Sequence, residues 1–276
     1  TNEILIGLPV PMEYGFGKPN VNIGEVENRG WELDLSWNDK IGEVSYGIQA
    51  NISNNKNKVL DLGGTGPWKD GYTAEGLPMK SIYGYEALGF FQSEEEIANS
   101  PFQNVKNKPG DIKYKNQNND DKIDGDDRVV IGDPNPHYLY GLRLNAAWKG
   151  FDISMFFQGI GKKDYIMNGP GIRPLSDSGG GPVFEHQLDY WSEDNRDAKY
   201  PRILTSDQAS FNYENSDFWK INAGYLRMKN LQIGYNFSNK LLKNSGFSNL
   251  RLYFSASNLF TIDNFVPGYD PETSNA

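Results

Sequence analysis

The sequence predicts an all-β protein that forms part of a large antiparallel transmembrane β-barrel, with short periplasmic turns and long extracellular loops. Three observations lead to this fold class. Apolar and polar residues alternate with a period of two in six segments. Short turns and long connections alternate along the chain. The alternating segments have roughly 8 to 13 residues, and a tilted strand needs about 9 to 11 to cross a bilayer.

The first pair of strands is expected at 31–38 and 44–53, joined by a short turn at 39–42, after a partial strand at 3–6. In each strand one face is apolar and the other is polar, as the two-residue period of a half-buried strand requires. The apolar face of the pair carries Trp31, Leu33, Leu35, Trp37, Val44, Tyr46, Ile48, Ala50 and Ile52.

The second pair of strands is expected at 138–148 and 151–158, joined at Lys149-Gly150, and the third at 225–237 and 250–260. Roughly ten residues separate the strands of the third pair. Arg227 and Lys229 interrupt the apolar face of 225–237, so the alternation of apolar and polar residues is less regular in that strand. Three polar residues fall on the face that would line a lumen, namely Arg143, Asn145 and Gln158.

Long connections separate the pairs, at 7–28, 54–137 and 161–222. The last two have roughly 60 to 80 residues, far more than the usual few. Short turns on one side and long loops on the other are typical of transmembrane barrels. A soluble sandwich stays open as an alternative, because aromatic residues fill sandwich cores too. Six strands and one partial strand cannot close a barrel, so we expect part of a larger one.

Composition excludes several classes of protein. Acidic residues outnumber basic ones 36 to 27, which gives a net charge of −9 and argues against nucleic-acid binding. The absence of cysteine excludes disulfides, thiolate zinc sites and a cysteine nucleophile. The two histidines, His137 and His186, have no nucleophile motif nearby, so no enzyme is expected. No apolar run is long enough for a transmembrane helix, and residues 1–6 do not read as a signal peptide.

One acidic segment, 116–127, resembles a calcium-binding loop. Closely spaced oxygen-bearing side chains on a tight loop supply the six to eight ligands that calcium needs. The pattern departs at Asp121, where glycine is usual, and at both ends. A solvated turn whose side chains cap their own backbone is the alternative. The candidate ligands of a structural Ca²⁺ are Asn116, Asn118, Asp120, Lys122 through its backbone carbonyl, Asp124 and Asp127.

Aromatic residues gather in the long connections, among them Trp68, Tyr72, Tyr83, Tyr85, Tyr190, Trp191 and Trp219. Aromatic faces beside Asp and Asn side chains suit sugar rings. Long ordered loops also need small cores of their own, and this second interpretation is favoured. Carboxylate pairs such as 94–96 and 126–127 are present, but nothing in the sequence places two of them across a cleft as a glycosidase needs.

Several motifs resemble those of SusC/RagA-type TonB-dependent outer-membrane transporters. They occur in family order over nearly the whole chain: Asn28-Arg29-Gly30-Trp31-Glu32, Asn54–Val59, Glu75–Pro78, Tyr83–Tyr85, Gly89–Phe91, Pro109–Tyr114, Asp127-Arg128, Ile131–Pro134, Phe151–Ser154, Phe157–Gly159, Tyr190-Trp191, Tyr200–Arg202, Tyr225–Asn230, Ser257–Thr261 and Gly268–Glu272.

The resemblance implies that residues 1–276 are the C-terminal portion of such a barrel, without the TonB box, the plug domain and the final strand. It implies a 22-stranded barrel in the outer membrane of a Gram-negative bacterium. The barrel would import a glycan, an oligosaccharide or a peptide, driven by TonB and covered by a SusD-like surface lipoprotein. This segment would supply barrel wall against outer-membrane lipid, and the loops 54–137 and 161–222 would shape the substrate cavity.

Two rival functions remain at this point. The first is a secreted β-sandwich that is stabilised by calcium and binds carbohydrate. The second is a soluble hydrolase.

Overall fold

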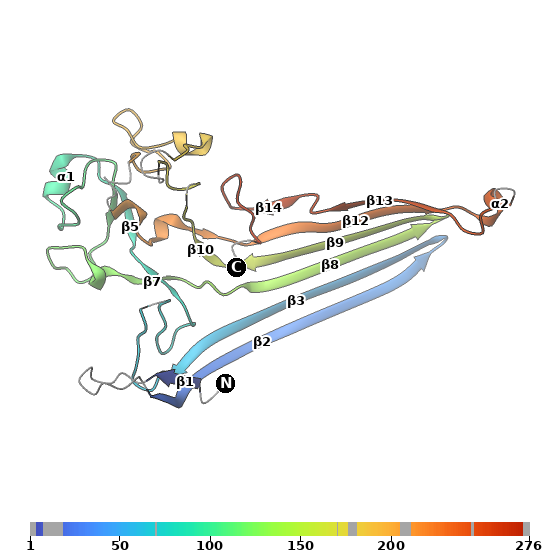
Figure 1. The fold of residues 1–276 in the computed structure, drawn as a ribbon, viewed down its shortest axis with the longest axis horizontal. Coiled ribbons are helices and arrows are strands. Elements are labelled where there is room, and N and C mark those ends of the chain that lie inside the picture. Colours follow the sequence, from blue (N-terminus) through green and yellow to red (C-terminus); the bar gives the residue numbers. More distant parts are fainter. Residues whose placement is uncertain are drawn as a thin grey trace.

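The structure is a computed structural model that describes residues 4–7, 19–69, 71–169, 171–175, 181–204, 211–243 and 246–272. One large antiparallel sheet dominates it (Figure 1). The strands lie in the order β1 (Ile4–Gly7), β2 (Asn20–Ile41), β3 (Val44–Asp61), β8 (His137–Trp148), β9 (Phe151–Lys162), β12 (Tyr225–Asn236) and β13 (Arg251–Ser257), and β14 (Thr261–Asp263) also pairs with β12. No described helix has the length and apolarity to cross a membrane.

The six predicted strands are present, and so is the partial first strand, but the first pair is longer than predicted. β2 begins at Asn20, so the prediction of a connection at 7–28 is wrong from that residue on. β3 likewise runs eight residues into the predicted loop 54–137. The polar segment Asn54–Lys58 has no apolar face that would reveal a strand, yet backbone pairing with β2 continues through it, and Asn57 donates a side-chain hydrogen bond to Asn28 at 2.8 Å.

The short connections lie at or next to the positions that the sequence predicts, although pairing continues through Ile41, so the first turn is at 42–43 and not at 39–42. Gly42 opens the turn between β2 and β3 with a φ of 60°. The turn between β8 and β9 uses Lys149 (φ 47°) and Gly150 (φ 91°), and two successive positive φ values match the right-handed twist of paired strands. The third connection carries the short helix α2 (Asn239–Leu242).

A β-bulge explains the irregular phase of β12. The register against β9 shifts between Met228 and Asn230. Before the bulge the apolar face carries Leu226 and Met228, and after it the same face carries Leu231 and Ile233, because the extra residue reverses the alternation. Arg227, which pairs with Gln158, therefore lies on the polar face and not on the apolar one.

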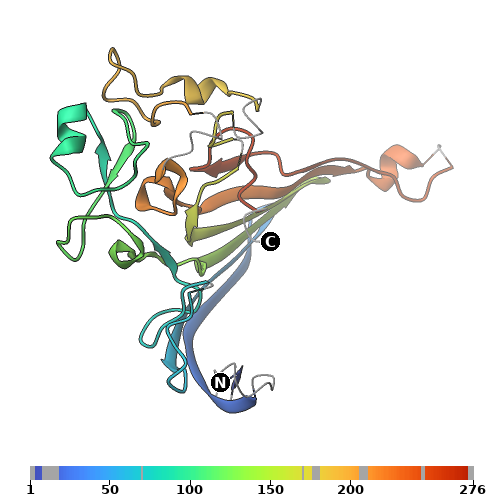
Figure 2. The same ribbon diagram turned by 60° about the vertical axis from the view of Figure 1, so that its left-hand side comes forward.

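The long connections 62–136 and 163–224 fold together at one end of the sheet (Figures 1 and 2). They form three two-stranded sheets, β4 with β7, β5 with β6 and β10 with β11. Their elements are β4 (Ile82–Gly84), β5 (Ala87–Phe90), α1 (Glu94–Ala98), β6 (Ile112–Tyr114), β7 (Val129–Gly132), β10 (Asp164–Ile166) and β11 (Lys220–Asn222), with 3-10 turns at Gly125–Asp127, Glu185–Leu188, Phe211–Tyr213 and Asp217–Trp219.

The main hydrophobic core lies within these connections and not against the large sheet. Its buried residues come from both connections: Tyr85, Ile112, Tyr114, Ile123, Met167, Ile172, Tyr200 and Trp219. Tyr85 and Trp219 thus belong to a core of the connections, as the favoured interpretation predicts, whereas Tyr190 is exposed. A smaller cluster of Val26, Val59 and Leu62 lies where β2 and β3 meet the first connection.

Candidate functional site

The large sheet has two chemically different faces. Cross-strand register places Leu35, Ala50, Leu142, Phe157 and Met228 in one row, and the next row has Trp37, Ile48, Leu144, Met155 and Leu231. Leu35 and Trp37 expose 60% and 61% of their surface, and Leu252 and Phe254 on β13 expose similar fractions. A broad apolar surface of this kind is unusual on a protein in water.

The opposite face of the same strands is polar. One row joins Asp34, Asn51, Gly141, Gln158 and Arg227, and the next joins Ser36, Gln49, Arg143, Phe156 and Asn230. Arg143 lies 5.5 Å from the centre of the Phe156 ring. On this face Ser154 donates a hydrogen bond to Asn145 at 2.9 Å. Arg143, Asn145 and Gln158 therefore lie on the polar face, as the alternation predicts.

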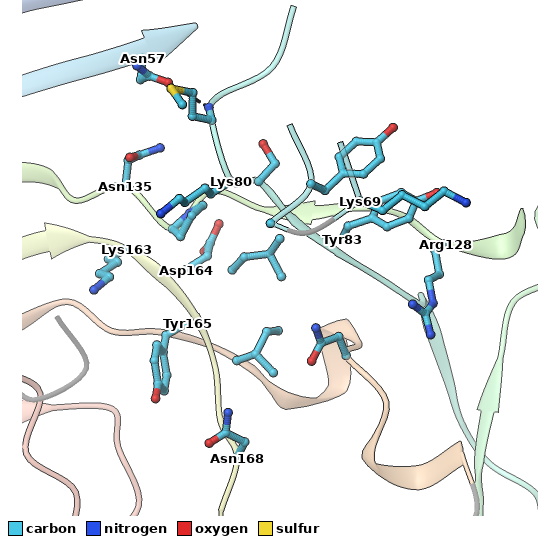
Figure 3. Close-up of a pocket in the computed structure, with 18 residues that line it drawn as sticks. Asn57, Lys69, Lys80, Tyr83, Arg128, Asn135, Lys163, Asp164, Tyr165 and Asn168 are labelled. Atoms are coloured by element: carbon cyan, nitrogen blue, oxygen red, sulfur yellow. Dashed lines mark hydrogen bonds between the residues drawn. The ribbon is translucent and has the colours of Figure 1, made fainter. Parts of the chain in front are cut away.

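A cavity of about 860 Å³ opens where the connections meet the end of the sheet (Figure 3). Asn57 at the end of β3 and Lys163 just after β9 border it from the sheet. The remaining described walls come from the first connection, at 69, 71–72, 79–83, 128 and 134–135, and from the second, at 164–166, 168 and 215. Its size is in the range of ligand-binding pockets.

Internal hydrogen bonds hold the cavity walls in place. Asp164 accepts a hydrogen bond from the Asp133 N–H at 2.9 Å, and its own N–H donates to the Asp133 carbonyl at 3.0 Å. Asn57 accepts a hydrogen bond from the Met79 N–H at 2.9 Å. The rings of Tyr72 and Tyr83 stack with their centres 3.9 Å apart. These contacts fix the positions of Asp164, Asn57, Tyr72 and Tyr83 in the cavity wall.

The cavity lining includes several charged side chains. Among the described residues these are Lys69, Lys80, Lys163, Arg128 and the carboxylate of Asp164. Burial lowers the pKa of the Lys163 ammonium and raises the pKa of the Tyr83 phenol. No sequence motif marks this site, because its lining residues are scattered along the chain.

The predicted calcium ligands occupy one tight loop, which includes the 3-10 turn Gly125–Asp127. Its carboxylates accept hydrogen bonds from the loop itself. Asp120 accepts from the Lys122 N–H at 2.9 Å, and Asp127, which is fully buried, accepts from Gln117 and Asp124 at 2.8 Å each. Asn116 and Asn118 make similar local contacts, with Asn119 and Asp120 respectively.

These contacts bear on whether the residues fit a calcium ion. The Lys122 ammonium forms an ion pair with the Asp124 carboxylate, and its positive charge would oppose a cation there. Among the described residues, no group of three or more histidine and carboxylate side chains is arranged to hold a metal ion. The side chains of this loop thus cap the backbone of the loop itself, as in the alternative interpretation of a solvated turn. The calcium site stays a prediction.

A calcium titration tests that prediction. If the loop binds calcium, the complete protein should give saturable heat that the double variant Asp120→Ala, Asp124→Ala loses, because two of the six proposed ligands are gone. The matched control is Asp189→Ala, an acidic residue in the other connection. Equal heats from all three proteins would remove the site.

Comparison with known proteins supplies relatives for this chain. No family model matches the sequence. TonB-dependent receptor P26 of Formosa agariphila is 29% identical over 288 residues, which cover 100% of this chain and 28% of that protein. TonB-dependent receptor SusC of Bacteroides thetaiotaomicron is 25% identical over 291 residues, which cover 99% of this chain and 27% of that protein.

The resemblance to SusC/RagA-type TonB-dependent receptors is confirmed. A solved structure agrees with it: the RagAB peptide importer in its open-open state matches with a TM-score of 0.75 and 25% identity, over 98% of this chain and 29% of that one. The predicted all-β antiparallel fold is therefore also confirmed, while the described strands alone do not form a closed barrel.

The named relatives are receptors and transporters rather than enzymes, which confirms the prediction that the chain is not an enzyme. The chain spans less than a third of the length of the TonB-dependent receptors that it matches. The activity of a whole receptor is therefore a matter for proposal.

Proposed function

We propose that this chain forms part of the barrel wall and part of the substrate cavity in a TonB-dependent nutrient importer of the Gram-negative outer membrane. The observation that carries the proposal is the pair of opposite sheet faces. Apolar rows that include Leu35, Trp37 and Ile48 would face lipid, and polar rows that include Gln49, Arg143 and Gln158 would face an aqueous lumen. Strands of membrane barrels alternate in this way.

The arrangement of the connections supports the same function. Both long connections lie at one end of the sheet and pack on a shared core, while the turns at the other end are short (Figure 1). In an importer of this kind the long connections would be extracellular, would shape the substrate cavity and would meet a SusD-like surface lipoprotein. TonB would supply energy through a part of the receptor that the matched segment does not represent.

The substrate that we propose is a glycan or oligosaccharide. Stacked tyrosines and several asparagine amides line the cavity, and these groups suit sugar rings and their hydroxyls. A peptide is the second candidate, because the structural relative is named a peptide importer.

The rival proposal of a secreted β-sandwich has less support. A sandwich packs two sheets face to face over a core about 10 Å thick. Among the described residues, the other sheets have two strands each, and Leu35, Trp37 and Ile48 on the apolar face of the large sheet stay exposed.

Fractionation of cells that express the complete gene tests the importer. We expect heat-modifiable protein in the outer membrane that co-purifies with a lipoprotein, and loss of oligosaccharide uptake when either the gene or TonB is removed. A control strain carrying the wild-type gene on a plasmid should regain uptake. A soluble, secreted product would contradict the importer and favour the carbohydrate-binding sandwich.

A further inference from the structure

We propose that the apolar face of the large sheet carries, at its edge beside the long connections, a binding site for the phosphorylated headgroup of a membrane glycolipid. The site lies on the opposite face from the substrate cavity, so it goes beyond the import of a substrate. Its orientation in the membrane rests on the proposed function. Three features carry the inference: the order of residues along the apolar face, a hollow at its edge, and exposed cations there.

The apolar face changes to a charged one within a single row of residues. Trp31 ends the apolar run on β2. The next row of the same face pairs Arg29 of β2 with Lys56 of β3, and the row after it pairs Glu27 with Lys58. These rows lie at the end of β2 and β3 where the long connections begin (Figure 1).

The position of this change matches the edge of a membrane. On the neighbouring strand β8 the apolar face extends from Trp148 to Tyr138. A strand rises about 3.3 Å per residue and tilts by about 40° in a barrel, so about ten residues cover about 25 Å of bilayer. The apolar band of outer-membrane barrels has this height, with aromatic residues at both edges. Arg29 and Lys56 thus lie just beyond the hydrocarbon, at the depth of lipid headgroups.

A hollow of about 400 Å³ lies at this edge of the apolar face. Among the described residues, Trp31 and Tyr138 line it with aromatic rings, and Arg29 and Lys56 line it with cations. Trp31 and Tyr138 are 50% and 44% exposed, so their rings are open to contact from the membrane side. Aromatic rings pack on sugar rings and on the upper part of acyl chains, and cations bind phosphate. The hollow therefore offers a contact for each part of a phosphorylated glycolipid.

The cations at this edge are accessible to an anion. Lys56 and Lys58 are exposed, and neither forms an ion pair or a side-chain hydrogen bond with another described residue. Arg29 pairs with Glu27 at 2.9 Å, but its side chain is 81% exposed, and such exposed pairs are weak. A phosphate has several charged acceptor oxygens, so it can bind Arg29 together with Lys56. Basic residues beside a membrane surface attract anionic headgroups in this way.

The opposite end of the same face differs. There the face on β2 ends with Asp39 and Ile41, and the Lys149 ammonium in the turn between β8 and β9 pairs with Glu43 at 2.8 Å. The exposed cationic rows thus belong to the end with the long connections, which is extracellular under the proposed function. The outer leaflet of a Gram-negative outer membrane consists of phosphorylated glycolipid, and this lipid is the occupant that we propose.

The test measures lipid binding by the complete receptor, stripped of lipid in detergent, with native mass spectrometry. The probes are lipid A, dephosphorylated lipid A, phosphatidylglycerol and glucosamine 1-phosphate. We expect lipid A to bind at least about tenfold more tightly than its dephosphorylated form, since charge-assisted hydrogen bonds to phosphate are the strong ones. Phosphatidylglycerol lacks the sugar and glucosamine 1-phosphate lacks the acyl chains, so both should bind more weakly than lipid A.

Matched variants locate the site. The variant R29Q/K56Q/K58Q should weaken binding of lipid A by about tenfold or more, and the charge-conserving variant R29K/K56R/K58R should keep it within about threefold. K56Q/K58Q, which leaves the pair of Arg29 and Glu27 in place, should weaken binding in part. The control K40Q/K149Q/K240Q removes three exposed lysines at the other end of the sheet and should leave binding unchanged.

Four results would overturn the inference. They are equal binding of dephosphorylated lipid A, tighter binding of phosphatidylglycerol, equally tight binding of glucosamine 1-phosphate, and full affinity in both glutamine variants. A receptor that inserts in the outer membrane and imports its substrate, but shows any of these results, would refute the glycolipid site and leave the importer intact. Absence of the receptor from the outer membrane would instead refute the importer.

Discussion

Replacing Ile48 with arginine is expected to destabilise the membrane-embedded protein by about 2–4 kcal/mol, the cost of a cation on the lipid face near the bilayer midplane. Ile48 lies on β3, which is paired on both sides, with Trp37 on β2 and Leu144 on β8 as its row neighbours. Ile48 is 41% exposed, on the apolar face. The measurement is urea unfolding of the complete protein in lipid vesicles, followed by the heat-modifiable shift on gels.

The adjacent residue provides the matched control. Gln49 lies on the same strand but on the polar face, in the row of Ser36 and Arg143. Gln49→Arg should therefore change the free energy of unfolding by less than about 1 kcal/mol, because its side chain would meet water. Equal losses from both substitutions would mean that the two faces do not separate lipid from lumen, and the wall assignment would fail.

Removing the carboxylate of Asp111 is expected to cost about 3–5 kcal/mol in the stability of the packed connections, the penalty for breaking a buried ion pair. Asp111 is fully buried and accepts hydrogen bonds from Arg202 at 2.6 and 3.1 Å. It also accepts from Asn212 at 2.9 Å and from the Lys108 N–H at 2.8 Å. This cluster joins the first connection to the second, so its loss should loosen both.

Hydrogen exchange in the complete protein measures this effect. In Asp111→Ala, the amide of Ile112, which donates to Asn212 at 2.7 Å, should exchange faster, while amides in β8 and β9 should keep their protection. Asp111→Asn should cost less, because its amide oxygen still accepts. As a control, Glu43→Ala breaks an exposed ion pair with Lys149 and should change stability by no more than about 0.5 kcal/mol. Unchanged exchange at Ile112 would contradict the role of the cluster.

Much of the wall could be predicted from the sequence. Leu33, Leu35 and Trp37 lie on one face of β2, and each short turn lies at or next to its predicted position. This succeeded because a strand reverses its side chains at every residue, so a face that meets one environment leaves a period of two in the sequence. Asn54–Lys58 has no apolar residues, so the predicted strand ended too early there. Backbone hydrogen bonds between strands continue through this segment, because they do not depend on apolar side chains.

The phase of β12 shows a different limit. Arg227 appeared to interrupt an apolar face, but the bulge beside Lys229 turns it to the polar one, where it pairs with Asp270 at 2.7 Å and Glu272 at 2.9 Å. An extra residue in one strand becomes visible only when its partner strand is known. The calcium pattern has a similar limit, because residue spacing does not reveal that the Lys122 ammonium lies on Asp124.

The sequence by itself determined the fold class, the paired strands, the two sheet faces and the resemblance to SusC/RagA-type receptors. These are local properties, and the alternation of apolar and polar residues, the turn residues and short motifs indicate them. Only the tertiary structure decided that Asp111 meets Arg202 and that Lys69, Lys80 and Lys163 line one cavity. The physical reason is that these contacts join residues tens of positions apart through the packing of two long connections, which carry no periodic pattern to set their path.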